Sequence, residues 1–371
     1  MKVSVLVNNF NYANFLGDAV NSCLKENVEL IVYDDGSTDE SMEVLKRYNS
    51  HINIISNPNY NHTSNENQAN AIYQAFLQSS GDIICLLDSD DKFSEDKISK
   101  ILKVFKDDTS ITTVQNLMLE MDSDGNLKNQ IRPIIKDVKD IKSYIFSDNN
   151  FFHLFVPTSG LSFRRSFLEK VLPLEEDGLN FVWPDARLSL LSVFYGKIHT
   201  IMEPLTYYRI HGTNDSNARS TTEGHETYLK QIYLYFNKLA ALNNLPKIEF
   251  SREIYLENTY FSLKLNRKVL KEFTVNDSPM YIWGGAGEAG QSIYHFLKKN
   301  KIKVDGFFDA NPKRIGEKNM GLVVTLPKFH KGIKYIISPI HAYHIIKEQL
   351  LARGFVEGVD FINPYKEYSN V

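Results

Sequence analysis

The chain has 371 residues, of which 43% are hydrophobic and 23% charged, and its formal net charge is −3 at pH 7. This balance is typical of a globular protein of about two domains and excludes a disordered chain. The slight negative charge excludes a broad basic surface, so we expect no nucleic-acid partner. Two cysteines, Cys23 and Cys85, stand in apolar stretches without metal-ligand spacing, which favours reduced core thiols over a disulfide.

The first residues of the chain, 2–7, have the pattern of a strand and lack the charged and apolar regions of a secretory signal. No apolar run approaches the roughly 18 residues that a membrane-spanning helix needs. We therefore predict a cytoplasmic protein. The sequence leaves open a peripheral association with the inner face of the membrane, and it does not determine the oligomeric state.

Short apolar runs alternate with helical patterns through the first part of the chain. Strands are predicted at residues 2–7, 28–33, 52–55 and 82–87, and helices at 15–24, 41–48 and 65–78. Strands that alternate with helices at this spacing predict an α/β fold with a parallel, doubly wound sheet. Each strand is nearly all apolar, as expected when helices cover both faces of the sheet.

The later part of the chain contains a second α/β pattern. Between the two patterns we predict strands with loops at 111–119 and 151–164, a helix and a returning strand within 180–215, and a long helical stretch at 225–272. The second pattern has strands at 280–283, 303–309 and 335–338, a glycine-rich turn at 284–290 and a helix at 291–299. We therefore predict a first domain at 1–217, a helical connector at 218–277 packed on it, and a smaller α/β domain at 278–371.

Two acidic clusters, residues 34–39 and 88–91, directly follow predicted strands. Ligands of an open parallel sheet bind outside the carboxyl ends of the strands, so both clusters belong to one edge. Clustered carboxylates repel one another, and hard oxygen ligands suit Mn²⁺ or Mg²⁺, which would stabilise a leaving diphosphate. Either cluster alone is equally consistent with a strand-ending turn, because Asp and Ser bond to nearby backbone.

Six segments, in order, resemble the family 2 glycosyltransferases of GT-A fold, over residues 1–217. They are VSVLVNNFNYANFL, ELIVYDDGSTDES, NQANAIYQAFLQSSGDIICLLDSDD, TSGLSFRRSFLEKV, WPDARLSLL and PLTYYRIHGTN. The resemblance implies a metal-dependent, inverting hexosyl- or N-acetylhexosaminyl-transferase. Its donor would be a nucleotide-diphosphate sugar, with a UDP-sugar favoured. Its acceptor would be a hydroxyl of a surface glycan, a teichoic-type polymer or a glycoprotein.

The resemblance also implies roles for individual residues. The implied donor-binding residues are Asn8, Phe10, Asp35, Gln68 and Asp88, with Phe10 stacking on the base and Asp35 accepting a hydrogen bond from a uracil N–H. The implied ligands of Mn²⁺ or Mg²⁺ are Asp90 and His211, and the implied catalytic base is Asp185. The family's usual Glu before the base is Pro184 here. An alternative for Asp185 is a helix N-cap, a position that aspartate favours.

The glycine-rich turn of the second domain has the spacing G-x-G-x-x-G. Gly285, Gly287 and Gly290 stand between a predicted strand and helix, and Asp309 ends the next strand. This context is typical of a dinucleotide-binding turn, in which a pyrophosphate approaches the helix N-terminus. The domain resembles the Rossmann-like domains appended to some bacterial polysaccharide-synthesis enzymes, which makes a second nucleotide site one interpretation. The alternative is a turn that serves only the fold. No residues suited to hydride transfer accompany it.

Two other functions compete with glycosyl transfer. A nucleotidyltransferase that forms nucleotide sugars normally has a glycine-rich, basic loop after its first strand, where this chain has Asn8-Asn9-Phe10-Asn11. A non-catalytic nucleotide-binding module is disfavoured because Asp185 and His211 accompany the acidic pair.

Overall fold

The chain divides into two compact units, Met1–Glu249 and Phe250–Val371. The computed structural model describes residues 1–24, 27–57, 63–174, 182–212, 222–275 and 278–365. The division falls within the predicted connector, whose two end residues, 218 and 277, lie outside the described residues. Helix α9 (Thr222–Leu242) belongs to the first unit, and the helices that follow it belong to the second.

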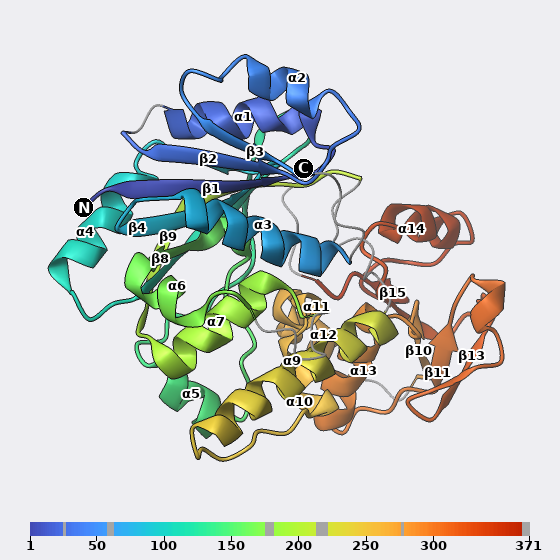
Figure 1. Ribbon diagram of the computed structural model, residues 1–371. Coiled ribbons are helices and arrows are strands. Elements are labelled where there is room, and N and C mark those ends of the chain that lie inside the picture. The colour runs from blue at the N-terminus through green and yellow to red at the C-terminus, as the bar shows by residue number, and fades with distance from the viewer. Residues whose placement is uncertain (25–26, 58–62, 175–181, 213–221, 276–277, 366–371) are drawn as a thin grey trace. The chain divides into compact units, whose positions relative to one another are not determined.

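The first unit is built on a mixed sheet in the order β3-β2-β1-β4-β8-β6-β9-β5, with β7 paired to β6 (Figure 1). Its described strands are β1 (Val3–Asn9), β2 (Glu29–Asp34), β3 (Asn53–Ser56), β4 (Ile83–Asp88), β5 (Lys92–Phe93), β6 (Thr113–Met121), β7 (Leu127–Ile131), β8 (Leu161–Arg164) and β9 (Ile198–Arg209). Its described helices, besides α9, are α1 (Ala13–Leu24), α2 (Ser41–Lys46), α3 (Ser64–Gln78), α4 (Lys97–Asp107), α5 (Ile141–Asp148), η1 (Thr158–Gly160), α6 (Arg165–Val171) and α7 (Pro184–Tyr195).

The predicted α/β fold is confirmed, and strands β1 to β4 form the predicted parallel sheet. β1 pairs in parallel with β2 and β4, and β2 pairs in parallel with β3. Beyond β4 the sheet is mixed, because β8 runs antiparallel to both β4 and β6, whereas β6 and β9 pair in parallel. β6 and β7 are joined by a tight turn at Asp122–Asn126, which only antiparallel strands allow.

Helices cover both faces of the parallel strands. Figure 1 shows α1 and α2 on one side of β1–β3 and α3, α6 and α7 on the other. Alternate residues of each strand face the α1 side, where they join buried residues of α1, α2 and α4 in one core. Cys23 and Cys85 are both buried in this core as free thiols, which confirms the prediction from the sequence.

The order of the strands determines where a ligand can bind. β1 has β2 and β3 on one side and β4 on the other, so the chain reverses its direction of winding between β1 and β4. In open α/β sheets the binding crevice lies at such a reversal, outside the carboxyl ends of the strands. Asn8 and Asp88 are paired in register at this place.

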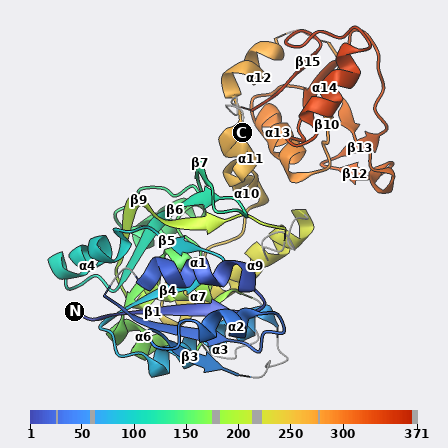
Figure 2. The same ribbon diagram turned by 90° about the horizontal axis from the view of Figure 1, so that it is seen from above.

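The second unit contains a smaller sheet in the order β12-β13-β11-β10-β14-β15, parallel except for the β12–β13 pair. Its described elements are α10 (Arg252–Asn258), α11 (Tyr260–Lys264), α12 (Arg267–Phe273), β10 (Met280–Trp283), α13 (Glu288–Lys299), β11 (Gly306–Phe308), η2 (Pro312–Arg314), β12 (Lys318–Asn319), β13 (Leu322–Thr325), β14 (Lys334–Ile337), α14 (Tyr343–Leu351) and β15 (Phe361–Ile362). Helices α13 and α14 bury their apolar faces in separate cores on opposite faces of this sheet (Figure 2). Within the described part of the chain, no helix combines the length and the apolar character needed to span a membrane.

Candidate active site

Three of the predicted donor-binding residues meet at the reversal between β1 and β4. Gln68 on α3 donates from Nε2 to Asp88 Oδ1 at 2.9 Å, and Asn8 Nδ2 lies 3.5 Å from the same oxygen. The backbone of the segment after β4 is also held, because Asp88 N donates to Ser159 Oγ at 3.0 Å and Ser89 N donates to Asn8 O at 3.1 Å. Asp88 is therefore held by two neighbours at its carboxylate and by a third, Ser159, at its backbone.

The two aspartates at the end of β2 have different surroundings. Asp34 is fully buried and accepts hydrogen bonds from Ser37 N at 2.9 Å, Ser37 Oγ at 2.7 Å and Asn9 Nδ2 at 2.7 Å, so it forms the strand-ending turn. Asp35 has a buried Oδ1 without a hydrogen-bond partner among the described residues. Burial, and then the charge of Asp34, raise the pKa of Asp35. Asp35 therefore has an acceptor available for a ligand.

Phe10 lies just beyond β1 and is 42% exposed. The loop that carries it is tied to the loop after β2, because Asn11 Oδ1 accepts from Thr38 N at 2.7 Å. An exposed ring on an anchored loop is suited to stacking on a planar base.

Asp90 and His211 form the most specific contact of the site. His211 Nε2 lies 3.0 Å from Asp90 Oδ2, and both side chains are largely buried. The imidazole packs against the ring of Phe15 in the first turn of α1 and that of Tyr12 just before the helix, with centroid distances of 4.8 Å and 5.4 Å. Residues 121 positions apart in the chain are thus brought together at the carboxyl edge of the sheet.

The residues present fit a hard divalent cation that is completed by a ligand. Among the described residues, no group of three or more His, Cys, Asp and Glu side chains is placed so as to hold a metal. Ions such as Mg²⁺ are commonly held by one or two carboxylates together with substrate phosphates and water. Asp90 and His211 supply such a partial set, and buried oxygens of Ser89 and Asp91 nearby have no hydrogen-bond partner among the described residues.

Negative charge accumulates in this part of the sheet edge. Burial, the charge of Asp90 and the charge of Asp185 raise the pKa of Asp88 to about 7, against the lowering effect of hydrogen bonds from Asn8 and Gln68. Burial and the charges of Asp90 and Asp88 also raise the pKa of Asp91. Such repulsion between carboxylates is relieved when a cation binds among them.

Asp185 contributes to this cluster from α7. The N-cap of α7 is Trp183, Pro184 opens the helix, and Asp185 lies in its first turn. The alternative that Asp185 is the N-cap is therefore wrong, because Pro184 occupies the first helical position, which suits proline, and this places the cap at Trp183, two residues before Asp185. Its charge raises the pKa of Asp88, so the two carboxylates share one electrostatic field.

Two buried cations behind the acidic segment were not predicted from the sequence. Lys97, at the start of α4, is fully buried and donates to Ser159 O at 2.6 Å and Thr206 Oγ1 at 2.8 Å. Burial lowers the pKa of Lys97 to about 8. Arg209, at the end of β9, is 1% exposed. The only signal of this burial in the sequence is that each charged residue stands among positions with the apolar pattern of buried residues.

Packing explains two of the three glycines in the G-x-G-x-x-G turn of the second unit. A Cβ at Gly285 would lie 2.1 Å from Phe307 Cδ1, and one at Gly290 would lie 2.4 Å from Gly285 Cα, so packing requires both glycines. A Cβ at Gly287 would approach nothing closer than 3.5 Å. Asp309 Oδ2 lies 3.4 Å from Arg314 Nη1. The close packing at Gly285 and Gly290 is sufficient to explain these glycines by the fold. A ligand at this turn stays a prediction.

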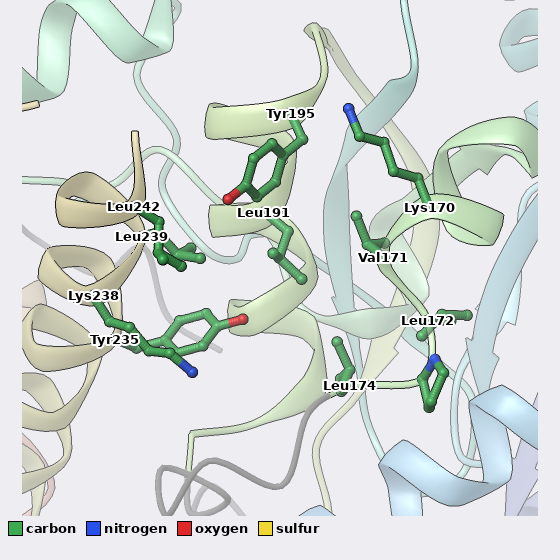
Figure 3. A pocket seen from close by; sticks show the side chains of 11 residues that line it. Lys170, Val171, Leu172, Leu174, Leu191, Tyr195, Tyr235, Lys238, Leu239 and Leu242 are labelled. Carbon is green, nitrogen blue, oxygen red and sulfur yellow. The ribbon is translucent and has the colours of Figure 1, made fainter. Parts of the chain in front are cut away.

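A separate cavity of about 270 Å³ lies between α6, α7 and α9 (Figure 3). Its wall includes Leu191 and Tyr195 from the C-terminal half of α7, whereas Asp185 lies in the first turn of that helix. None of the predicted donor, metal or catalytic residues lines it. This cavity is therefore distinct from the candidate active site.

Comparison with known proteins places the chain in a family. Residues 4–172 match the model of glycosyl transferase family 2. An uncharacterized glycosyltransferase of Nostoc sp. is 30% identical over 270 residues, which span 70% of this chain and 83% of the relative. The chondroitin synthase of Pasteurella multocida is 31% identical over 131 residues, which span 34% of this chain and 13% of the synthase.

Solved structures of low sequence identity are also similar. TarS of S. aureus in complex with UDP-GlcNAc has a TM-score of 0.47 and 16% identity, with coverage of 71% of this chain and 72% of that one. The mannosyltransferase PcManGT of Pyrobaculum calidifontis, in complex with GDP-Man and Mn²⁺, has a TM-score of 0.46 and 13% identity, with coverage of 67% and 66%. On the match to the family model and the extended match to the Nostoc relative, this chain is a glycosyltransferase and belongs to glycosyltransferase family 2.

Proposed function

We propose that the enzyme transfers a sugar from a UDP-sugar to an acceptor hydroxyl with inversion, with Mn²⁺ or Mg²⁺ held by Asp90 and His211 and with Asp185 as the base. The observation that carries this proposal is the 3.0 Å contact between Asp90 and His211 at the carboxyl edge of the sheet, within the field that also includes Asp88 and Asp185. A metal-bridged diphosphate and a nearby carboxylate are the two parts that such a transfer needs.

The donor would lie along the edge from β2 to β4. Phe10 would stack on the base, and the available oxygen of Asp35 would accept a hydrogen bond from the uracil N–H. Asn8, Gln68 and Asp88 would line the ribose and diphosphate side, where Gln68 already orients Asp88. A divalent cation bound by Asp90 and His211 would neutralise the diphosphate charge.

The chemical step is a single displacement at the anomeric carbon. The acceptor oxygen forms a bond to this carbon as the bond from the carbon to the β-phosphate oxygen breaks. The nucleoside diphosphate leaves with the electron pair of the broken bond, and Asp185 takes the proton of the acceptor hydroxyl. Alignment of the two substrates supplies a large part of the rate enhancement.

The acceptor proposed from the family resemblance is a surface glycan, a teichoic-type polymer or a glycoprotein. Synthesis of such polymers fits a cytoplasmic enzyme that associates loosely with the inner face of a membrane.

The experiment that tests the proposal measures release of UDP from UDP-sugars in the presence of Mn²⁺. Asp185→Asn is expected to lower turnover ~10²- to 10⁴-fold, because the general base is lost, while binding of Mn²⁺ and UDP is unchanged. The matched control is Asp107→Asn, in the exposed last turn of α4, which should leave turnover as in the wild type. Wild-type turnover in Asp185→Asn would refute its role as the base.

A further inference from the structure

Arg209 is a charged residue in an unusually buried position. It ends β9, two residues before His211, and only 1% of it is exposed. Burial of a guanidinium is unfavourable unless its donors are hydrogen-bonded, so the contacts of this side chain must offset a considerable desolvation cost.

The contacts of Arg209 converge on the acidic segment after β4. Its backbone N donates to Asp91 Oδ1 at 2.9 Å, and its Nε donates to Asp90 O at 2.8 Å. Its Nη1 donates to Ser123 O at 3.0 Å, and its Nη2 donates to Asp18 Oδ2 at 2.8 Å. One residue therefore ties the 88–91 segment to α1 and to the turn after β6.

The same part of α1 holds both Arg209 and His211. The Arg209 guanidinium stacks over the Phe15 ring at 4.7 Å, and the His211 ring lies 4.8 Å from that ring. Asp18, one turn along α1 from Phe15, supplies the counter-charge to Arg209. Arg209 thus fixes the backbone of Asp90 on one side and the start of the segment that carries His211 on the other.

We propose that Arg209 is a positioning residue for the cation and donor site, which holds Asp90 and His211 at the separation needed to bind one cation. This inference rests on the proposed function of that pair. The planar fork of arginine bonds in several fixed directions at once, which the single ammonium of lysine cannot do. Partners that orient metal ligands typically change metal affinity ~10- to 100-fold when they are replaced.

Arg164 provides a matched control within the same sheet. Its Nε donates to Ile111 O at 2.6 Å, its Nη2 donates to Asp108 O at 3.2 Å, and its guanidinium stacks over Phe105 at 4.9 Å. It is paired with Ile83 at the opposite, amino end of β4. Arg164 therefore shares with Arg209 the contacts to backbone carbonyls and to a phenylalanine ring, but at the edge away from the candidate site.

The experiment titrates the full-length protein with Mn²⁺ alone and with Mn²⁺ plus UDP, and it measures free Mn²⁺ by electron paramagnetic resonance. Thermal unfolding is recorded in parallel. Arg209→Lys is expected to weaken Mn²⁺ binding ~10- to 100-fold. Arg164→Lys is expected to lower the melting temperature without a change in Mn²⁺ affinity.

The outcomes distinguish a role of Arg209 in positioning the cation ligands from a contribution to the stability of the fold alone. Wild-type Mn²⁺ affinity in Arg209→Lys, or an equal loss in Arg164→Lys, would overturn the role of Arg209. If Arg209→Lys does not fold, Asp18→Asn provides the test, since Asp18 is about half-exposed and its replacement should leave the fold intact. This variant is expected to weaken Mn²⁺ binding about threefold to tenfold. An unchanged Mn²⁺ affinity in Asp18→Asn would overturn the proposal. Asp90→Ala tests the proposed function separately, because undiminished Mn²⁺ binding in that variant would reject the cation site itself.

Discussion

At the scale of single residues, hydrogen bonding separates side chains of the same type into structural and functional ones. Asp34 and Asp35 are adjacent in the chain, yet Asp34 is engaged by Ser37 and Asn9, while Asp35 has a buried oxygen without a partner among the described residues. A carboxylate already bonded to its own turn stabilises the fold. A buried carboxylate with a raised pKa and an available oxygen lowers stability unless a ligand binds to it.

This contrast predicts opposite effects for two neighbouring substitutions. Asp34→Ala should lower the free energy of unfolding by about 2–4 kcal/mol, because Ser37 and Asn9 lose their buried acceptor. Asp35→Ala should leave stability unchanged or slightly higher, but should weaken UDP binding ~10- to 100-fold. Urea unfolding and isothermal titration with UDP and Mn²⁺ measure the two effects, and each variant is the control for the other. The assignment is wrong if Asp35→Ala lowers the free energy of unfolding as much as Asp34→Ala does and binds UDP with wild-type affinity.

The acidic clusters could be predicted from the sequence because they follow recognisable strands, as Asp88 and Asp90 do. Arg209 and Lys97 could not be predicted, since their partners are distant in the chain. Arg209 bonds to Asp18, 191 positions away, and Lys97 bonds to Thr206, 109 positions away. Local pattern determines where charges gather, but tertiary packing determines which of them are buried and paired.

At the scale of elements, Glu29 joins the first strands at their amino ends. Glu29 begins β2, and its carboxylate accepts from Lys2 Nζ at 2.8 Å and from Ser80 N at 2.6 Å, so it connects β1, β2 and the segment before β4. Burial raises the pKa of Glu29, but hydrogen bonds from Lys2, Ser4 and Ser80 outweigh it and lower the pKa from 4.5 to about 2. The charged form is therefore favoured in the folded state.

We expect Glu29 to stabilise the fold in a pH-dependent way. A depressed carboxyl pKa contributes stability above the ordinary value of 4.5, and this contribution is lost as the pH falls toward about 2. Glu29→Gln should lower the free energy of unfolding at pH 7 by about 1–2 kcal/mol, with allowance for solvent screening. The difference from the wild type should shrink between pH 5 and 3, as measured by urea unfolding. Glu169→Gln, at an exposed position of α6, is the control; a constant difference across this range would contradict the assignment.

Strands and helices with a clear hydrophobic pattern could be predicted from the sequence, whereas very short strands and the breaks within a helical stretch could not. Strands β1 to β4 agree with the predicted runs to within two residues because each has a short apolar run at its centre. The helical stretch predicted at 225–272 is interrupted after α9, where Asn244 adopts a left-handed conformation (φ 56°) and Pro246 follows. Strands of two residues, such as β5 and β15, have no periodic signal because pairing with strands elsewhere in the chain defines them.

At the scale of the whole molecule, all residues proposed for donor, cation and base lie in one unit. The first unit ends at Glu249, beyond α9. Its last residues are fixed to α9, because Ile248 N donates to Asn237 Oδ1 at 2.9 Å and Asn237 Nδ2 donates to Ile248 O at 2.8 Å. The second unit has its own cores on both faces of its sheet. Each unit therefore has the internal contacts expected of a part that folds by itself.

This division predicts that a fragment of residues 1–249 binds Mn²⁺ and UDP as the full-length chain does. The dissociation constants should agree within about twofold, or about 0.4 kcal/mol, because no proposed ligand contact is removed. The measurement is isothermal titration of both proteins, with the fragment carrying Asp90→Ala as the control that should not bind Mn²⁺. A folded fragment with much weaker UDP binding would mean that residues from Phe250 onward take part in holding the donor. An unchanged affinity would mean that the Gly287 turn takes no part in binding the donor, so any ligand of this turn would be a different molecule.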